Sequence, residues 1–414
     1  MPFLRSPGSS KSIEFSALEA RTMFCAEHNG LAIDPTVILR NKQSSPILHT
    51  LSTLTVPALN SRVGAKATLY LDFDGDPAST WVGYHPTSTP AYDIDSNVSS
   101  FSATELANIR EIWARVAEKF SPFDINVTTV NPGTLVDGKS MKVVIGGDGA
   151  WSGQVCGGLS YVSSFVSSSL PNVVYAFSDN LGSGYPKFVA EAAAHETGHA
   201  FGLQHQSQWN GTVKVTEYYQ GDGIIAPTMG NSYSSNRGLW WKGTSSLNQV
   251  QDDLFIIGGA TNGFGYRPDD WGSSFATAKA AKFIGGKFSF NGVVSTTTDY
   301  DCFVVTSVGA NITLKLRTPA QGAMLDGTLR LYRVDGTLVA KADTASLGET
   351  INKFLPAGKY VAIVQSHGSY GDVGQYTLYG YQTAVGSAPS AGTNPFSTTP
   401  IKHSMVELIE DANA

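Results

Sequence analysis

Three histidines lie together in the stretch AAAHETGHAFGLQH (residues 192–205). On a helix, residues four apart share one face, so His195 and His199 can offer imidazole nitrogens to one point. Gly202 can adopt backbone angles that other residues avoid, which lets the helix end and the chain turn until His205 reaches the same point. Three neutral imidazoles suit Zn²⁺ and leave a fourth position for water, which is the arrangement of a catalytic zinc site.

A glutamate, Glu196, follows the first of these histidines and should lie beside the metal. An ionised carboxylate only accepts hydrogen bonds, so Glu196 is suited to take a proton from an activated water. The alternative is a core helix whose histidines bond to backbone carbonyls, the commoner role of a single buried histidine. Five spaced residues match H-E-x-x-H-x-x-G-x-x-H, and this pattern favours the zinc site.

Residues 64 to 262 resemble the metzincin zinc metalloendopeptidases, in a bacterial reprolysin-like or matrixin-like branch. Besides the histidine motif, the resemblance lies in YLDFDGD, IREIWARVAEKFSPFDINVTT and APTMGNSY. It implies a catalytic domain with a twisted mixed sheet and two long helices, which hydrolyses peptide bonds of protein or peptide substrates. It also implies one Zn²⁺ on His195, His199 and His205, with Glu196 as the general base. By analogy, the edge strand GLSYVSSF pairs with an extended substrate.

Two further residues follow from the same resemblance. Met229, in APTMGNSY, resembles the Met-turn whose methionine forms an apolar floor under the zinc; an ordinary buried methionine is the alternative. Tyr233 is a candidate oxyanion donor, but it comes four residues after Met229 and not two, as in astacins and serralysins, so a surface aromatic remains the alternative. Gln206, directly after the third histidine, matches no metzincin subfamily.

Hydrophobic periodicity predicts the elements that position this motif. The clearest helix is FSATELANIREIWARVAEKFSPFD, where Ser102 and Glu105 form a capping box and Pro122 ends the helix. A second helix is expected from Pro186 to about Leu203. Strands are expected at 66–76, 124–130, 141–147, 158–165 and 172–180. Elements in this order predict an α/β (α+β) layer over residues 63–262, with both helices against the sheet.

A region of short alternating strands without helices follows residues 263–278 and predicts a β-sandwich. Residues 266–382 resemble the bacterial pre-peptidase C-terminal domain in DDWGSSFATA, DYDCFVV, LRLYRVDGTLVA, LPAGKYVAIV and GQYTLYGY. The change of composition near residue 265 predicts a domain boundary with few crossing contacts. Residues 1–62 read as a poorly structured leader or pro-segment, and residues 383–414 as a flexible linker and tail.

Composition excludes several classes of partner. A net charge of -6 without a basic block argues against nucleic acid and anionic membranes. No apolar run is long enough for a membrane span, and the first residues lack the apolar core of an ordinary signal peptide. We nevertheless expect a monomer that is secreted or in the cell envelope. The expected localisation rests on the frequent occurrence of such sandwich domains in secreted proteases and on FSALEARTMFCA, which resembles a segment of planctomycete surface proteins.

Three alternatives stay open. Cys25 is either a pro-segment thiolate that keeps the enzyme latent or a plain leader cysteine, and it forms no paired pattern with Cys156 or Cys302. Four aspartates either bind Ca²⁺ or are solvated turn residues: Asp269, Asp270, Asp299 and Asp301. The whole chain is either an endopeptidase or a surface adhesion or binding protein with a vestigial zinc site.

Overall fold

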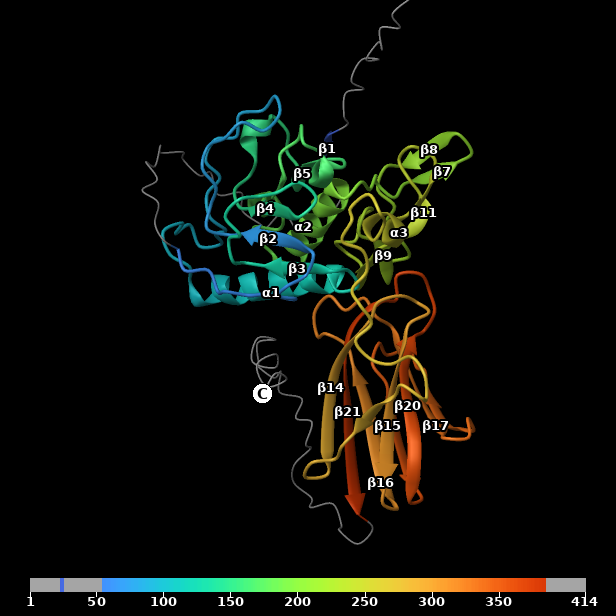
Figure 1. The fold of residues 1–414 in the computed structure, drawn as a ribbon. Helices are drawn as coiled ribbons and strands as arrows, with labels where there is room; N and C mark the ends of the chain where they lie inside the picture. The colour runs from blue at the N-terminus through green and yellow to red at the C-terminus, as the bar shows by residue number, and fades with distance from the viewer. Residues whose placement is uncertain (1–22, 26–53, 385–414) are drawn as a thin grey trace, which may run out of the picture.

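A mixed α/β unit is followed by an all-β unit in this computed structural model, which describes residues 23–25 and 54–384 (Figure 1). The first unit is built on a six-stranded sheet in the order β1-β5-β6-β4-β2-β3. Strand β2 is parallel to β3 and to β4, and β4 is parallel to β6, whereas β5 is antiparallel to β6. The strands are β1 Met23–Cys25, β2 Ala67–Asp72, β3 Ile125–Thr128, β4 Ser140–Ile145, β5 Gly158–Tyr161 and β6 Val173–Ala176.

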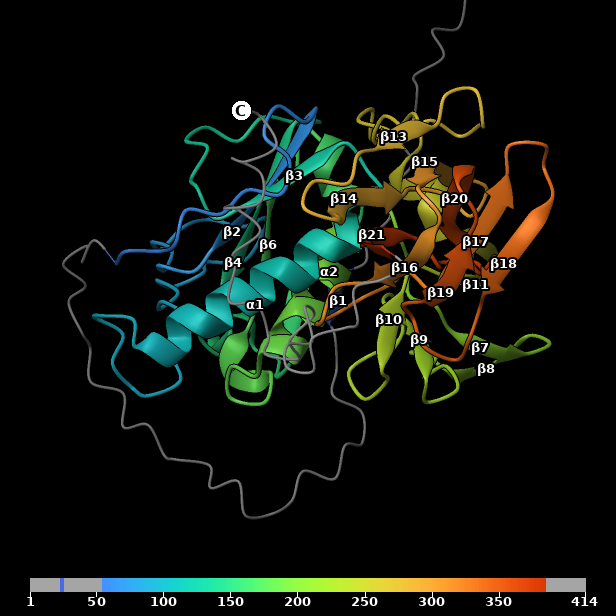
Figure 2. The same cartoon turned by 90° about the horizontal axis from the view of Figure 1, so that it is seen from below.

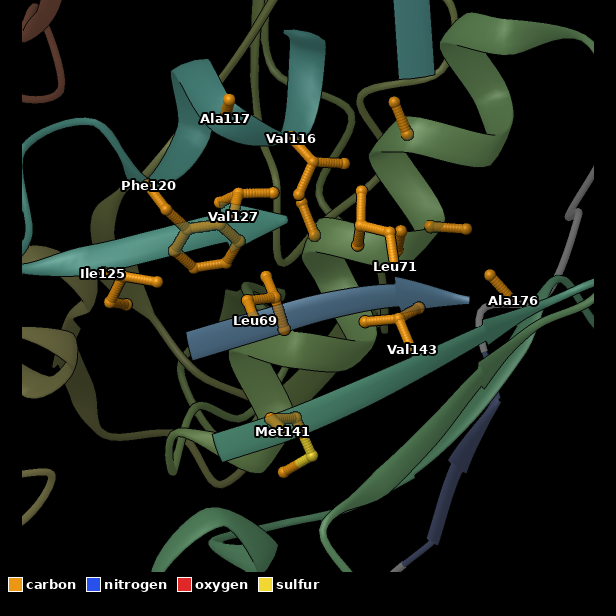
Figure 3. Packing of buried hydrophobic residues seen from close by; sticks show 14 of the residues in the cluster. Leu69, Leu71, Val116, Ala117, Phe120, Ile125, Val127, Met141, Val143 and Ala176 are labelled. Atoms are coloured by element: carbon orange, nitrogen blue, oxygen red, sulfur yellow. The ribbon is translucent and has the colours of Figure 1, made fainter. Parts of the chain in front are cut away.

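Two long helices pack against this sheet and against each other. Helix α1, Ala103–Phe120, begins at the predicted capping box, in which Ser102 N–H donates to Glu105 Oε2 over 2.6 Å. Helix α2, Pro186–Ala200, consists mostly of small buried residues, which lets it lie close to the sheet. Figure 3 shows Val116 and Phe120 of α1 above sheet residues, including Leu69 and Val127. One hydrophobic core therefore joins both helices to one face of the sheet.

Short elements that the sequence did not predict follow α2. They form three small two-stranded sheets and one short helix. These elements are β7 Gln208–Asn210, β8 Val213–Thr216, β9 Ile225–Pro227, β10 Arg237–Leu239, β11 Lys242–Thr244, β12 Val250–Asp252 and α3 Asp253–Ile257. Three-residue strands carry too little alternation to be read from sequence.

The second unit is a sandwich of two sheets with a hydrophobic core of its own. The five-stranded sheet has the order β13-β15-β20-β17-β18, and the four-stranded sheet the order β14-β21-β16-β19. Their strands are β13 Lys279–Ala281, β14 Lys287–Val294, β15 Tyr300–Ser307, β16 Ala310–Arg317, β17 Gly327–Arg333, β18 Leu338–Ala342, β19 Thr350–Leu355, β20 Gly358–Ser366 and β21 Gly374–Ala384. The expectation of a mixed α/β unit followed by a β-sandwich is confirmed at this level, although β13, β14 and β19 were not predicted.

Several predicted boundaries shift. The strand expected at 158–165 ends at Tyr161, because Ser163 turns the chain at a φ of 62° into a 3₁₀ turn. The second helix ends at Ala200, three residues before the predicted end, and Gly202 then has a φ of 103°. Leu59 is buried and receives the Thr129 N–H over 3.1 Å, so this part of the expected leader packs on the first unit. The other leader residues, 1–22 and 26–53, and the tail 385–414 lie outside the described residues. No helix in the described ranges is long and apolar enough to cross a membrane.

The expectation of few contacts between the two units is wrong. The end of α1 lies against the sandwich beside β21, as Figure 2 shows from below. There the buried Glu118 carboxylate accepts the Met324 N–H over 3.1 Å and both the N–H and the side-chain amide of Gln375 over 3.2 and 3.0 Å. Arg237 of β10 forms an ion pair with Asp372 at the same boundary. Sequence periodicity does not reveal such contacts, since they join residues more than 130 positions apart in the chain.

Replacing Glu118 with Ala should loosen this boundary. The change leaves buried N–H groups of the sandwich without acceptors, which should lower the free energy of unfolding by roughly 2–4 kcal/mol. Calorimetry checks this as a lower midpoint and as separate transitions for the two units. Glu118→Gln, which keeps one carbonyl oxygen, should lose less, and an unchanged Glu118→Ala midpoint would show that these bonds do not hold the units together.

Candidate metal centre

The three histidines of the motif converge at one point. His195 and His199 lie one turn apart on α2, and their Nε2 atoms are 3.1 Å apart. Past the turn at Gly202, His205 returns to the same place, so that one ring nitrogen of each histidine lies within 4.8 Å of the others. All three side chains are buried. The turn at Gly202 thus brings His205 back to the other two histidines, as the residue type and its position in the motif predicted.

Hydrogen bonds at the opposite ring nitrogens fix the orientation of each imidazole. The Nδ1 atom of His195 lies 2.8 Å from Thr228 O, and that of His199 lies 2.8 Å from Leu203 O. The Nδ1 atom of His205 lies 2.6 Å from Glu217 Oε1. Carbonyl and carboxylate oxygens only accept, so each Nδ1 carries the proton and each Nε2 presents a lone pair.

These lone pairs make the site fit a metal cation. Two Nε2 acceptors facing each other at 3.1 Å repel unless a cation lies between them. The separation is close to the roughly 3.3 Å expected for two nitrogens each about 2.0–2.1 Å from one tetrahedral zinc. Burial lowers the pKa of His195 to about 4 and holds the pKa values of His199 and His205 well below the usual range. The imidazoles are therefore neutral at physiological pH, as metal binding requires.

Glu196 lies in the same buried centre, between α2 and β5. Its side chain is fully buried, and neither carboxylate oxygen has a hydrogen-bond partner among the described residues. Burial raises the pKa of Glu196 well above its usual range, so that its ionised form is a stronger base than a solvated carboxylate. A Cβ atom on Gly158, the first residue of β5, would lie 2.6 Å from Glu196 Cγ and 2.5 Å from Tyr175 O. Only glycine at this position lets the strand pass so close to the glutamate.

Met229 lies beneath the histidine-bearing turn of α2. A Cβ atom on Gly198 would be 2.4 Å from Met229 Sδ, so the thioether fills the space beside this glycine. The Met229 carbonyl accepts the Gln206 N–H over 2.8 Å, next to His205. Gln206 itself is buried and donates to Asp253 Oδ1 over 2.9 Å, which gives it a structural role.

Two tyrosines border the centre. Tyr233 is buried against Phe188, with ring centroids 5.3 Å apart, so the surface-aromatic alternative is wrong. Burial first, and then the nearby Glu196 and Glu191 carboxylates, raise the pKa of Tyr233 well above its usual range, which keeps its hydroxyl protonated. Tyr218, which sequence reasoning missed, places its ring centroid 4.3 Å from that of His205.

Glu217 is the other residue that sequence reasoning missed. It follows β8, binds His205 Nδ1 and also pairs with Lys214. Carboxylates behind metal-binding histidines fix the ring and raise its basicity. Its sequence signal is weak, because an acidic residue twelve positions after a histidine is not part of any spacing rule.

We expect Glu217→Gln to weaken zinc binding by about 10–100-fold, because the amide removes the charge behind His205. Competition with a chromophoric zinc chelator measures the affinity. Lys214→Ala is the matched control, since it removes the ion pair of Glu217 and leaves the bond to His205. Equal affinity of Glu217→Gln and the wild type would remove Glu217 from the metal site.

The outer edge of β5 carries a second strand of this chain. Strand β1 pairs with it antiparallel, with Met23 opposite Tyr161 and Cys25 opposite Leu159. The next position along β5 is Gly158, beside Glu196. An extended segment on this edge therefore runs alongside the candidate base.

A second group of acidic residues in the first unit lacks the features of a metal site. Asp93, Asp95 and Glu105 lie close together. Asp93 Oδ1 accepts the N–H groups of Asp95, Ser96 and Asn97, and Glu105 caps α1. These carboxylates have structural partners already.

No protein-family model and no curated protein sequence matches this chain. Solved structures similar to part of it include the pre-peptidase C-terminal domain of collagenase from Bacillus anthracis, at 19% identity over 28% of this chain and 97% of that one, with a TM-score of 0.22. PliG, a periplasmic inhibitor of g-type lysozyme, is another. The Aeromonas hydrophila protein is 14% identical over 26% of this chain and 96% of its own, with a TM-score of 0.22. The Salmonella Typhimurium protein is 13% identical over 26% of this chain and 99% of its own, with a TM-score of 0.19.

Proposed function

We propose that this chain is a zinc-dependent endopeptidase of the metzincin type. The observation that carries the proposal is the buried set of three neutral imidazoles, His195, His199 and His205, directed at one point beside the buried carboxylate of Glu196. A purely structural role for these histidines would explain the hydrogen bonds at their Nδ1 atoms. It would not explain why the Nε2 lone pairs of all three rings are directed at the same point. It also leaves the buried Glu196 carboxylate, which has no hydrogen-bond partner among the described residues, without a compensating interaction.

Each residue has a definite task in peptide hydrolysis. The Nε2 atoms of the three histidines would hold the zinc, which would supply a Lewis acid to lower the pKa of a water and to polarise the scissile carbonyl. Glu196 accepts a proton from the attacking water and delivers it to the leaving amine nitrogen. Tyr233, protonated at its hydroxyl, is the candidate donor to the developing oxyanion.

The edge of β5 is the proposed substrate-binding strand. This edge pairs with β1 as an antiparallel partner, so it can bind an extended peptide in the same way once β1 is displaced. A substrate bound there runs past Gly158 and brings its backbone beside Glu196. Main-chain hydrogen bonds of this kind carry little sequence preference, which suits a protease of unfolded segments.

The role of the second unit, the location and the oligomeric state are proposed from the sequence resemblance. The sandwich is proposed to be a pre-peptidase C-terminal domain that carries no catalytic group. We further propose that the protein acts as a monomer, outside the cell or in the cell envelope.

Digestion of unfolded casein tests the proposed activity. The full chain, and in parallel a form lacking residues 1–53 so that β1 no longer covers β5, is incubated with casein and the new N-termini are sequenced. An endopeptidase generates internal N-termini that a zinc-binding adhesion protein does not. Intact casein after incubation with both forms would favour the binding protein.

A further inference from the structure

A buried lysine, Lys119, lies at the C-terminal end of α1 and contacts the helix that carries the first two histidines. Only 1% of its side chain is exposed. Its Nζ atom donates to Glu191 Oε2 over 3.0 Å, to Thr228 Oγ1 over 3.1 Å and to Gly238 O. An ammonium group has three N–H donors, so these bonds use all of them. The three acceptors belong to three separate segments, namely α2, the residues after β9, and β10.

The surrounding residues fit closely around this ion pair. The Ser232 hydroxyl donates to Glu191 Oε2 over 2.6 Å, so this oxygen accepts from two donors. A Cβ atom on Gly238 would lie 2.3 Å from Glu191 Oε2 and 2.6 Å from Lys119 Nζ, so only glycine lets β10 approach the pair. The Lys119 carbonyl accepts the Trp240 indole N–H over 2.7 Å. The lysine is therefore held at its backbone and at the end of its side chain.

Thr228 connects the ion pair to the candidate metal centre. Its carbonyl oxygen lies 2.8 Å from His195 Nδ1 and accepts the proton of that ring. Its N–H donates to Leu239 O over 2.7 Å, and its hydroxyl oxygen accepts from Lys119. Thr228 is thus held at three points, and its carbonyl sets the direction of the His195 imidazole.

Glu191 connects the same ammonium group to the helix that carries His195. It lies four residues before His195 on α2, so the two side chains share one face of the helix, one turn apart. The bond from Lys119 to Glu191 therefore resists rotation of α2 about its axis. One ammonium group consequently holds both the helix that carries His195 and the residue whose carbonyl orients its ring.

Stability alone does not account for this arrangement. Taking an ammonium and a carboxylate out of water costs free energy that their mutual attraction offsets only in part. A well-packed apolar pair of similar volume is often at least as stable. An apolar pair would not give the directed hydrogen bonds that fix Glu191 and Thr228 relative to each other.

We propose that Lys119 is a positioning residue for the metal ligand His195 and acts through Thr228 and Glu191. This inference rests on the proposed metal centre and gives a role in it to α1, which carries none of the three histidines. Partners directly behind metal-binding histidines typically change metal affinity by about 10–100-fold. Lys119 acts through an intervening residue, so we expect an effect at the lower end of this range.

Metal titration of the metal-free full chain tests this role. Competition with a chromophoric chelator gives the zinc affinity, and the visible absorption of bound Co²⁺ reports the geometry of the site. Lys119→Met should weaken zinc binding by about tenfold and alter the Co²⁺ spectrum. Because this variant leaves Glu191 buried without its cation, the double variant Lys119→Met/Glu191→Gln replaces it if it does not fold. The double variant should show at least the same loss of zinc affinity.

Thr228→Val tests the route from the lysine to the histidine. Valine has nearly the shape of threonine and keeps the backbone carbonyl, but it removes the hydroxyl that accepts from Lys119. We expect this variant to weaken zinc binding as well. Added to the double variant, it should cause little further loss, because the hydroxyl has then already lost its donor. Fully additive losses would contradict a route through Thr228.

Lys142→Met is the matched control, because it also removes an ammonium group from a partly buried ion pair. Lys142 of β4 pairs with Asp72 and Asp76, so its loss leaves the bonds of Thr228 and Glu191 in place. It should lower the free energy of unfolding and leave the zinc affinity and the Co²⁺ spectrum unchanged. An equal loss of zinc affinity in Lys142→Met would overturn the inference, since it would reflect general destabilisation.

Two further outcomes separate this inference from the proposed function. Wild-type zinc affinity and an unchanged Co²⁺ spectrum in folded Lys119→Met, or in the folded double variant, would overturn the role of Lys119 and leave the metal centre standing. A wild-type chain that binds neither zinc nor Co²⁺ would overturn the metal centre and this inference together.

Discussion

Glu196→Gln should retain its zinc and lose peptide hydrolysis by at least ~10²–10⁴-fold, the usual contribution of general-base catalysis. Glutamine has nearly the shape of glutamate but no basic oxygen that can accept a proton from water. The buried carboxylate makes no hydrogen bond within the described residues, so the change breaks no structural contact. The value of kcat/KM on a fluorescent casein, with zinc measured in the same samples, gives the result.

A matched substitution separates catalysis from stability. Glu111→Gln, on α1, changes the same functional group in an ion pair with Arg115 away from the centre, and it should leave turnover unchanged. Equal cleavage by Glu196→Gln and the wild type would remove Glu196 from the mechanism.

His199→Ala should reduce the zinc content of the protein from about one ion per chain to near zero. Two histidines and water are a poor zinc site, because three protein ligands are the usual minimum of catalytic sites. Casein cleavage should vanish with the metal. Elemental analysis after dialysis against zinc-free buffer measures the loss.

The control for this variant is His367→Ala, which removes an exposed histidine of the sandwich that pairs with Asp343. It should keep both zinc and activity. Zinc bound at wild-type stoichiometry in His199→Ala would mean that the metal lies elsewhere.

The core of the candidate site was predictable because it depends on local geometry. The four-residue spacing of His195 and His199 fixes their common face, and Gly202 permits the turn that returns His205. The capping box and apolar stripe of α1 are local in the same way, as is the alternation in the longer sandwich strands.

Parts that depend on distant segments were not predictable from one sequence. The acceptors behind two of the histidines, Thr228 O and Glu217, come from loops and short strands whose positions depend on the packed core. Glu118 reads as an ordinary helix residue until its contacts with the sandwich are known. Strand β5 ends at Tyr161 because the chain turns at Ser163, whose left-handed backbone conformation is not marked by a glycine in the sequence.

Stepwise return of zinc to the metal-free chain, with casein cleavage read at each step, tests the central claim most directly. The account predicts activity that rises in proportion to added zinc and reaches a plateau at about one ion per chain, the occupancy of a site formed by His195, His199 and His205. Cleavage that is already complete without zinc, or that stays absent at full occupancy of this site, would contradict it.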